Sequence, residues 1–256
     1  MLQPHSFLWH YLWVGPNVLL LVLALLLRRL RVHERYTFFI VFAVAIAIEQ
    51  LTIYVTDVIP AVSPETWWRV FWAGLMFEGL LKFALVGEIF AHIFDEYHSV
   101  AALGKFLIRA VGIILVLTAA IAAAYAPADS LFGIVSGAHL LEQTIYLIES
   151  GLLVFIFLFS AYFSLRPTRP ILGIALGLAA SACVHLATWG IVANGGLPES
   201  QRVILDFVNM AAYHVCVLIW FFFLLVPQKV ALKSAVPLPE NNLEVWNREL
   251  ERLVHL

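Results

Sequence analysis

Seven apolar stretches, each about twenty residues or longer, set the class of fold that is open to this chain. A helix needs about 20 apolar residues to cross the hydrocarbon core of a bilayer. Lipid cannot satisfy backbone hydrogen bonds, and the apolar runs are continuous rather than alternating, so helices are predicted and not barrel strands. The stretches cover roughly residues 10–30, 37–58, 67–94, 106–126, 131–163, 170–193 and 202–226. The sequence therefore predicts an all-α integral membrane protein, a seven-transmembrane-helix bundle over residues 1–228.

Composition agrees with a membrane class. The chain is 62% hydrophobic and 12% charged, whereas soluble domains average about 45–50% apolar and about 25% charged residues. The formal net charge of −2 gives no basis for nucleic-acid binding. We expect a multi-pass protein of the cell or inner membrane, whose first partner is the lipid bilayer.

The distribution of Lys and Arg predicts the orientation. Cytoplasmic connections are enriched in basic residues. Only Arg69 and Arg202 lie in the connections of one side, which places the N-terminus outside and the C-terminus in the cytoplasm. The other side holds Arg28, Arg29, Arg31, Arg35, Lys105, Arg109, Arg166, Arg169, Lys229 and Lys233. Six tryptophans near the outer boundary are predicted to form an interfacial aromatic belt: Trp9, Trp13, Trp67, Trp68, Trp72 and Trp189.

Residues 229–256 are predicted to form a cytoplasmic tail. Leu243, Trp246, Leu250 and Leu253 recur at helical spacing. They predict a short amphipathic helix at about 241–255, and acidic residues on its other faces favour packing on protein over an anionic leaflet. A cytoplasmic protein partner is one candidate occupant of its apolar face.

Ionisable residues inside the apolar stretches are the main functional signal. A charge at mid-bilayer depth costs roughly 2.5–3.5 kcal/mol on insertion scales, so such residues usually face a bundle interior. On the fifth stretch, polar residues share a face about 120° wide: His139, Glu142, Gln143, Tyr146, Glu149 and Ser150. On the third stretch, Glu78 and Lys82 stand at i and i+4, the spacing of an ion pair.

The other stretches add polar groups at similar depth. Asp206, Asn209 and Tyr213 form a stripe on the seventh stretch, with His214 about 80–100° away around the helix. Glu49 and His185 lie in the second and sixth stretches. Most of these residues fall in the outer half or at the middle of their stretches. The simplest arrangement is a buried polar pocket that opens to the extracytoplasmic side.

The charge balance of this pocket leaves several chemistries open. Five acids face one lysine: Glu49, Glu78, Glu142, Glu149 and Asp206 against Lys82. Uncompensated, they would not be tolerated at low dielectric, so some acids are protonated, some histidines are charged, or a cation is bound. Zinc or iron would use carboxylate and imidazole ligands. The candidate ligands are His139, Glu142, Glu78, Glu49, His185 and His214; neutral hydrogen-bonded acids and core histidines are the alternative. Haem bound by two of the three histidines is a further option.

Two families offer partial resemblances. Seven spans with the N-terminus outside resemble the topology of rhodopsins and G-protein-coupled receptors, but the seventh stretch has no lysine, so no retinal Schiff base is expected. Phe94-Asp95-Glu96-Tyr97 lacks the following arginine of a receptor motif. A second resemblance is to membrane hydrolases of the alkaline-ceramidase and adiponectin-receptor type, which carry two histidines four residues apart on the last helix. Here the last stretch has His214, but the positions four residues before and after it are Met210 and Leu218. Neither resemblance carries functional residues over.

Three functions follow as hypotheses. The first is a pocket that binds a metal ion or small ligand, with hydrolytic or redox chemistry open. The second is a non-catalytic sensor, similar to a receptor, that signals through its cytoplasmic tail. The third is proton or ion translocation along Glu142, Glu149, Glu88 and His92.

Overall fold

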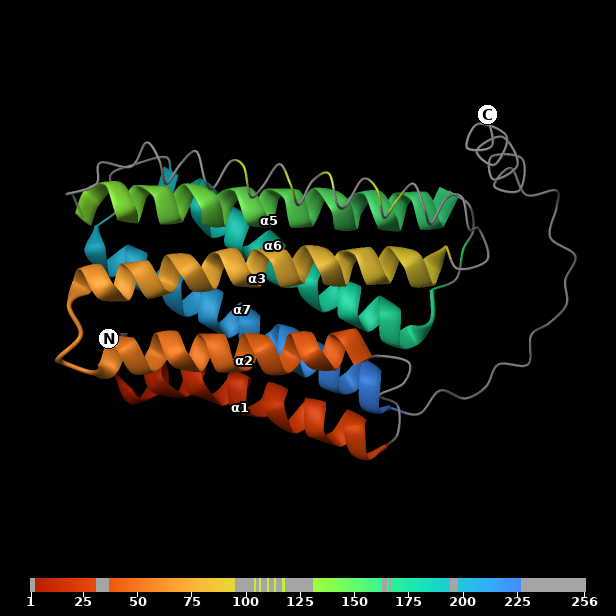
Figure 1. Cartoon of the computed structure of the whole chain (residues 1–256), viewed down its shortest axis with the longest axis horizontal. Helices are drawn as coiled ribbons and strands as arrows, with labels where there is room; N and C mark the ends of the chain where they lie inside the picture. Colours follow the sequence, from red (N-terminus) through yellow and green to blue (C-terminus); the bar gives the residue numbers. More distant parts are fainter. Residues whose placement is uncertain are drawn as a thin grey trace, which may run out of the picture.

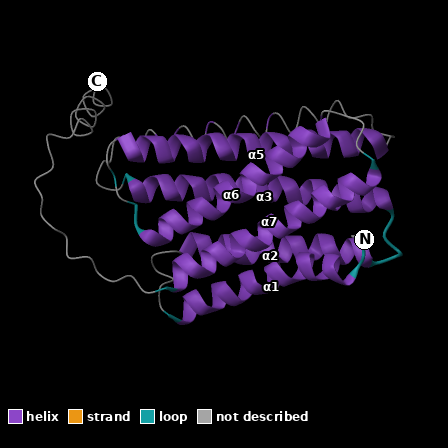
Figure 2. Ribbon diagram, turned by 180° about the vertical axis from the view of Figure 1, so that it is seen from behind, coloured by secondary structure: helices purple, strands orange, loops and turns teal. Residues whose placement is uncertain are grey.

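The computed structural model describes residues 3–30, 37–94, 131–162, 167–193 and 198–226, with the single positions 104, 106, 110, 113, 117 and 165. Only the backbone is described for residues 131–140, 193 and 199. These ranges contain helices and no strand (Figures 1 and 2). The helices are α1 (Phe7–Arg29), α2 (Thr37–Val58), α3 (Pro64–Ile93), α5 (Leu131–Tyr162), α6 (Arg169–Ala193) and α7 (Glu199–Leu225).

Six of the predicted spans are confirmed as helices, with ends within three residues of those expected. Each of these six is long and apolar enough to cross a membrane, so the chain is a helical, multi-pass membrane protein by length and composition. The predicted span at 106–126 lies outside the described residues apart from four single positions, and the predicted tail helix at 241–255 lies wholly outside them.

Local sequence explains where the helices begin. Ser6 and Ser63 are N-caps whose hydroxyl groups accept hydrogen bonds from the backbone N–H groups of Trp9 and Thr66, at 3.3 and 3.2 Å. Pro64 occupies the first turn of α3, where its missing N–H costs nothing. Both caps lie at one end of the bundle, which we call the N-terminal end.

The six described helices form a ring. Along the chain, α1 packs on α2, α2 on α3, α3 on α5, α5 on α6, α6 on α7, and α7 returns to α1. The contacts between α3 and α5 show that these two helices are parallel, since Lys82 meets Glu149 and Phe94 meets Phe159 further along both. Both therefore begin at the N-terminal end of the bundle (Figure 1). The ring leaves a space enclosed by all six helices.

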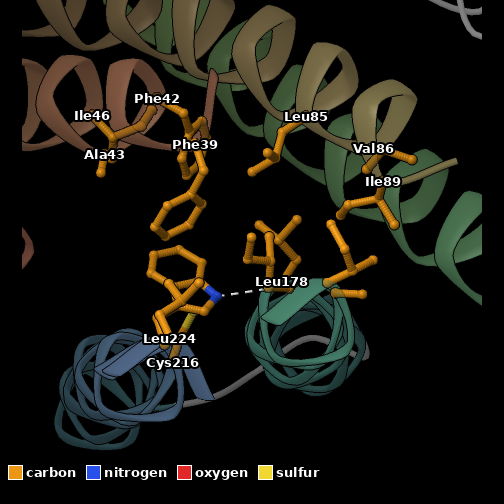
Figure 3. Close-up of a cluster of buried hydrophobic side chains, with 14 of the residues drawn as sticks. Phe39, Phe42, Ala43, Ile46, Leu85, Val86, Ile89, Leu178, Cys216 and Leu224 are labelled. Atoms are coloured by element: carbon orange, nitrogen blue, oxygen red, sulfur yellow. Dashed lines mark hydrogen bonds between the residues drawn. The ribbon is translucent and has the colours of Figure 1, made fainter. Parts of the chain in front are cut away.

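One half of the ring interior is filled by a hydrophobic core. Phe39 and Phe42 of α2 and Leu85 and Ile89 of α3 pack in one cluster with side chains of α6 and α7 (Figure 3). Trp220 of α7 is 2% exposed, and its indole N–H donates to the Ile174 carbonyl oxygen at 3.2 Å. The core thus closes the end of the ring away from the N-terminal end.

The contact between α6 and α7 depends on two glycines. A Cβ at Gly177 would collide with the Trp220 indole, and one at Gly173 would collide with Phe223. Because neither glycine carries a Cβ, the two helices approach closely enough for the indole to reach the α6 backbone.

We therefore expect Gly177→Ala to destabilise the bundle by about 1–3 kcal/mol, the usual cost of overpacking a core. Thermal unfolding in detergent measures the change. Gly190→Ala on the same helix is the control, because nothing lies within 4 Å of its added Cβ. Equal melting temperatures for the two variants would contradict the packing described.

Candidate functional site

A pocket of about 700 Å³ lies inside the ring and receives side chains from all six described helices. Trp9, Asp57, Trp67 and Arg202 line it at the N-terminal end, where α2 ends and α3 and α7 begin. Its opposite end is formed by core residues, namely Phe42, Leu178, Cys216 and Trp220 (Figure 3 labels the first three). The pocket therefore extends from the N-terminal end of the bundle to the packed side chains of the core.

A buried lysine between two acids is the centre of the pocket. The Lys82 ammonium lies 2.8 Å from Glu78 Oε1, one turn away on α3, and 3.4 Å from Glu149 Oε2 on α5. The three side chains are 8%, 13% and 1% exposed. A buried ammonium is tolerated only when paired, so the predicted Glu78–Lys82 pair is confirmed and Glu149 is added as its partner across the helices.

Tyr146 joins this ion pair to α6. Lys82 Nζ lies 4.2 Å from the centroid of the Tyr146 ring, a cation–π contact. The same ring stacks on His185 with centroids 4.2 Å apart. His185 Nδ1 is 3.1 Å from the Ser181 carbonyl oxygen, which can only accept, so the proton sits on Nδ1 and Nε2 is left for another partner.

Glu49 stands on the α2 wall of the pocket. Both of its carboxylate oxygens are buried, and neither accepts a hydrogen bond from the described residues. A Cβ at Gly74 of α3 would collide with Glu49 Oε1, so the missing side chain makes room for the carboxylate. Its neighbour Gln50 donates instead to Glu78 Oε2, at 3.4 Å.

Two polar contacts tie α7 to its neighbours. Tyr213 donates to Asn17 Oδ1 at 2.9 Å, and the Asn17 amide donates to the Trp13 carbonyl oxygen at 2.7 Å. On the other side, Thr188 of α6 donates to Asn209 Oδ1 at 2.9 Å. Asn17 and Thr188 were not predicted, although an amide beside Pro16 within an apolar run is itself a signal of an interior position.

Most of the predicted site residues line the pocket. Asp206, Asn209 and Tyr213 do so as one stripe, as the spacing predicts. The ten predicted residues that line it are Glu49, Glu78, Lys82, Glu142, Tyr146, Glu149, His185, Asp206, Asn209 and Tyr213. Their functional role stays a prediction.

Two predicted residues lie outside the described pocket lining, and the side chain of a third is not described. The His214 ring lies 5.7 Å from that of Tyr11 on α1, outside the pocket lining, because it sits around the helix from the Asp206 stripe. Gln143 is also absent from the lining. His139 is part of α5, but its side chain lies outside the described residues.

The predicted ligands of zinc or iron do not assemble within the described side chains. No group of three His, Cys, Asp or Glu residues there is close enough to share an ion. Glu78 is held by Lys82, and His185 and His214 face different neighbours. Metal and haem binding stay predictions without support from these residues.

The predicted aromatic belt is also part of the pocket. Five of its six tryptophans line the wall toward the N-terminal end: Trp9, Trp13, Trp67, Trp68 and Trp189. Trp9 is 8% exposed, so its indole packs inside the bundle more than against the surroundings. The wall of the pocket at the N-terminal end is therefore rich in aromatic side chains, beside Asp57 and Arg202, and the Lys82 ion pair lies deeper.

Removal of the central ammonium has a predictable cost. Breaking a buried ion pair from one side typically costs about 3–5 kcal/mol, so Lys82→Met should strongly lower the melting temperature in detergent. Adding Glu78→Gln and Glu149→Gln should restore much of the loss, because no unpaired carboxylate then remains at this point. If Lys82→Met melts like the unmodified protein, Lys82 does not hold the two acids.

Comparisons with known proteins do not assign a function to this chain. The sequence matches no protein-family model, and neither curated proteins nor solved structures show a match to it. Function resides in the site rather than in the fold, so the geometry of the pocket has to carry the functional argument.

Proposed function

We propose that this protein is a membrane-embedded binding protein whose pocket takes up one small, polar-headed molecule from the extracytoplasmic side. The observation that carries the proposal is the Lys82 ion pair inside a pocket of about 700 Å³. Pockets for small ligands usually have about 300–1,000 Å³, apolar walls and a few converging polar groups. The aromatic approach and the charged interior have this composition.

The closed floor favours binding over translocation. Phe42, Leu178 and Trp220 belong to the hydrophobic core and separate the pocket from the far end of the bundle. Glu88 and His92 do not line the pocket, and the exposed His92 ring contacts the Glu88 carbonyl oxygen at 3.0 Å. The described residues therefore offer no polar path along Glu142, Glu149, Glu88 and His92.

Seven spans and an outside N-terminus complete the proposal. Because α3 and α5 are parallel, the chain between Ile93 and Leu131 has to return from one end of the bundle to the other. The predicted span at 106–126 is long enough for that crossing. Phe106, Ile113 and Leu117 are helical, 55–66% exposed and spaced as one helical face, which suits contact with lipid. The basic connections then lie in the cytoplasm.

Single cysteines test this topology. In a Cys183→Ala, Cys216→Ala background, we expect Gln3→Cys to react with a membrane-impermeant maleimide in intact cells. Ser234→Cys should react only after permeabilisation, because seven crossings put the two positions on opposite sides. Ala61→Cys and Val32→Cys serve as matched outer and inner controls. Reaction of Gln3→Cys and Ser234→Cys from the same side would contradict seven spans.

Filling the pocket tests ligand binding. Met210 and Val208 are two residues apart on α7, so their side chains point to different sides of the helix. Met210 lines the pocket, whereas Val208 is 42% exposed and does not. The test is a thermal-shift screen of small amphiphiles with cationic, anionic and neutral heads. We expect one class of amphiphile to raise the melting temperature of both the unmodified protein and Val208→Trp. Met210→Trp should lose that response; an equal response in both variants would argue against the pocket.

A further inference from the structure

We infer that the molecule bound in this pocket is an organic cation with an apolar part, a protonated amine or a quaternary ammonium compound. The inference rests on the proposed binding function and narrows its ligand class. It depends on three independent features of the pocket: its charge balance, its unsatisfied buried carboxylates, and the aromatic rings along its approach.

The pocket carries more negative than positive groups. Among the described residues, its lining has two side chains of fixed positive charge, Lys82 and Arg202, and six acids. The acids are Glu49, Asp57, Glu78, Glu142, Glu149 and Asp206. At the depth of Lys82, one ammonium serves both Glu78 and Glu149. Glu49, Glu78 and Glu149 therefore outnumber the one ammonium of Lys82 in this part of the pocket. A bound cation would balance this surplus at low dielectric, whereas an anionic ligand would add to it.

Two buried carboxylates retain unused acceptor capacity. Glu149 is 1% exposed, and although Oε2 lies near Lys82, neither of its oxygens accepts a hydrogen bond from the described residues. Both Glu49 oxygens are likewise buried and without such a bond. Both residues line the pocket. An ammonium head group would supply the missing positive charge, and a protonated amine would also supply N–H donors.

The aromatic approach selects the rest of the ligand. Trp9, Trp13, Trp67 and Trp68 line the pocket on the N-terminal side of Glu49 and Glu149. The faces of indole rings attract cations and pack against apolar groups, and aromatic cages are a known means of binding quaternary ammonium. The Lys82–Tyr146 contact already shows this interaction inside the pocket. Indole rings provide no ligands for a metal ion, so an organic cation suits this lining better.

A matched set of probes tests the inference on the full chain in nanodiscs made from zwitterionic lipid. The probes are benzyltrimethylammonium, its uncharged carbon isostere neopentylbenzene, and the anion phenylmethanesulfonate. Affinity is measured by equilibrium dialysis, with quenching of tryptophan fluorescence as a second readout. We expect the cation to bind at least about tenfold more tightly than either other probe, the effect of one charge-assisted contact.

Two variants locate the binding. Glu49→Gln keeps the size of the side chain and removes its charge, so it should weaken cation binding about tenfold. Glu88→Gln is the control, because Glu88 lies on α3 outside the pocket lining, and it should leave the affinity unchanged. Glu49→Gln should not alter the affinity for neopentylbenzene.

The failures of the two proposals are distinguishable. Equal affinity for the cation and its isostere, or a preference for the anion, would overturn the cation assignment. The proposed binding function would still stand if some class of probe stabilises the unmodified protein and Val208→Trp but not Met210→Trp. Cation binding that survives both Glu49→Gln and Met210→Trp would place it elsewhere and overturn the inference. If no class of probe distinguishes Met210→Trp from Val208→Trp, both proposals fail.

Discussion

The ion pairs of Lys82 are the interaction on which the arrangement of the pocket depends. An ammonium with 8% exposure needs carboxylate partners, and these come from its own helix and from α5. The requirement fixes how α3 and α5 are rotated against each other and directs both acids inward. Tyr146 and His185 then extend the polar contacts to α6. The surplus of acids around this lysine sets the electrostatics that any ligand meets.

Close packing at the other end of the ring gives the pocket its depth. Gly173 and Gly177 allow α6 and α7 to approach, with Phe223 packed against Gly173 and the Trp220 indole against Gly177. With Phe39, Phe42 and Leu178, it forms a floor that separates the charged interior from the far end of the bundle. The same ring thus has a packed half that stabilises it and a hollow half that is suited to binding.

The sequence predicted the helices well because membrane spans follow from continuous hydropathy, and it predicted contacts within one helix because their spacing is fixed. The Glu78–Lys82 pair and the stripe of Asp206, Asn209 and Tyr213 are examples. Contacts between helices could not be predicted from the sequence, since the rotation of each helix about its axis is set by tertiary packing. For that reason Glu149 was not assigned to Lys82, and His214 was placed in the site although it lies toward Tyr11.

The most direct test of the pocket is an experimental structure of the full chain in a nanodisc with benzyltrimethylammonium at saturation. We expect the cation inside the ring, between the tryptophans of the open end and the carboxylates of Glu49 and Glu149, with Lys82 still between Glu78 and Glu149. A cation bound only on the lipid-facing surface, or a ring interior filled by side chains with Lys82 turned away from both acids, would contradict this arrangement.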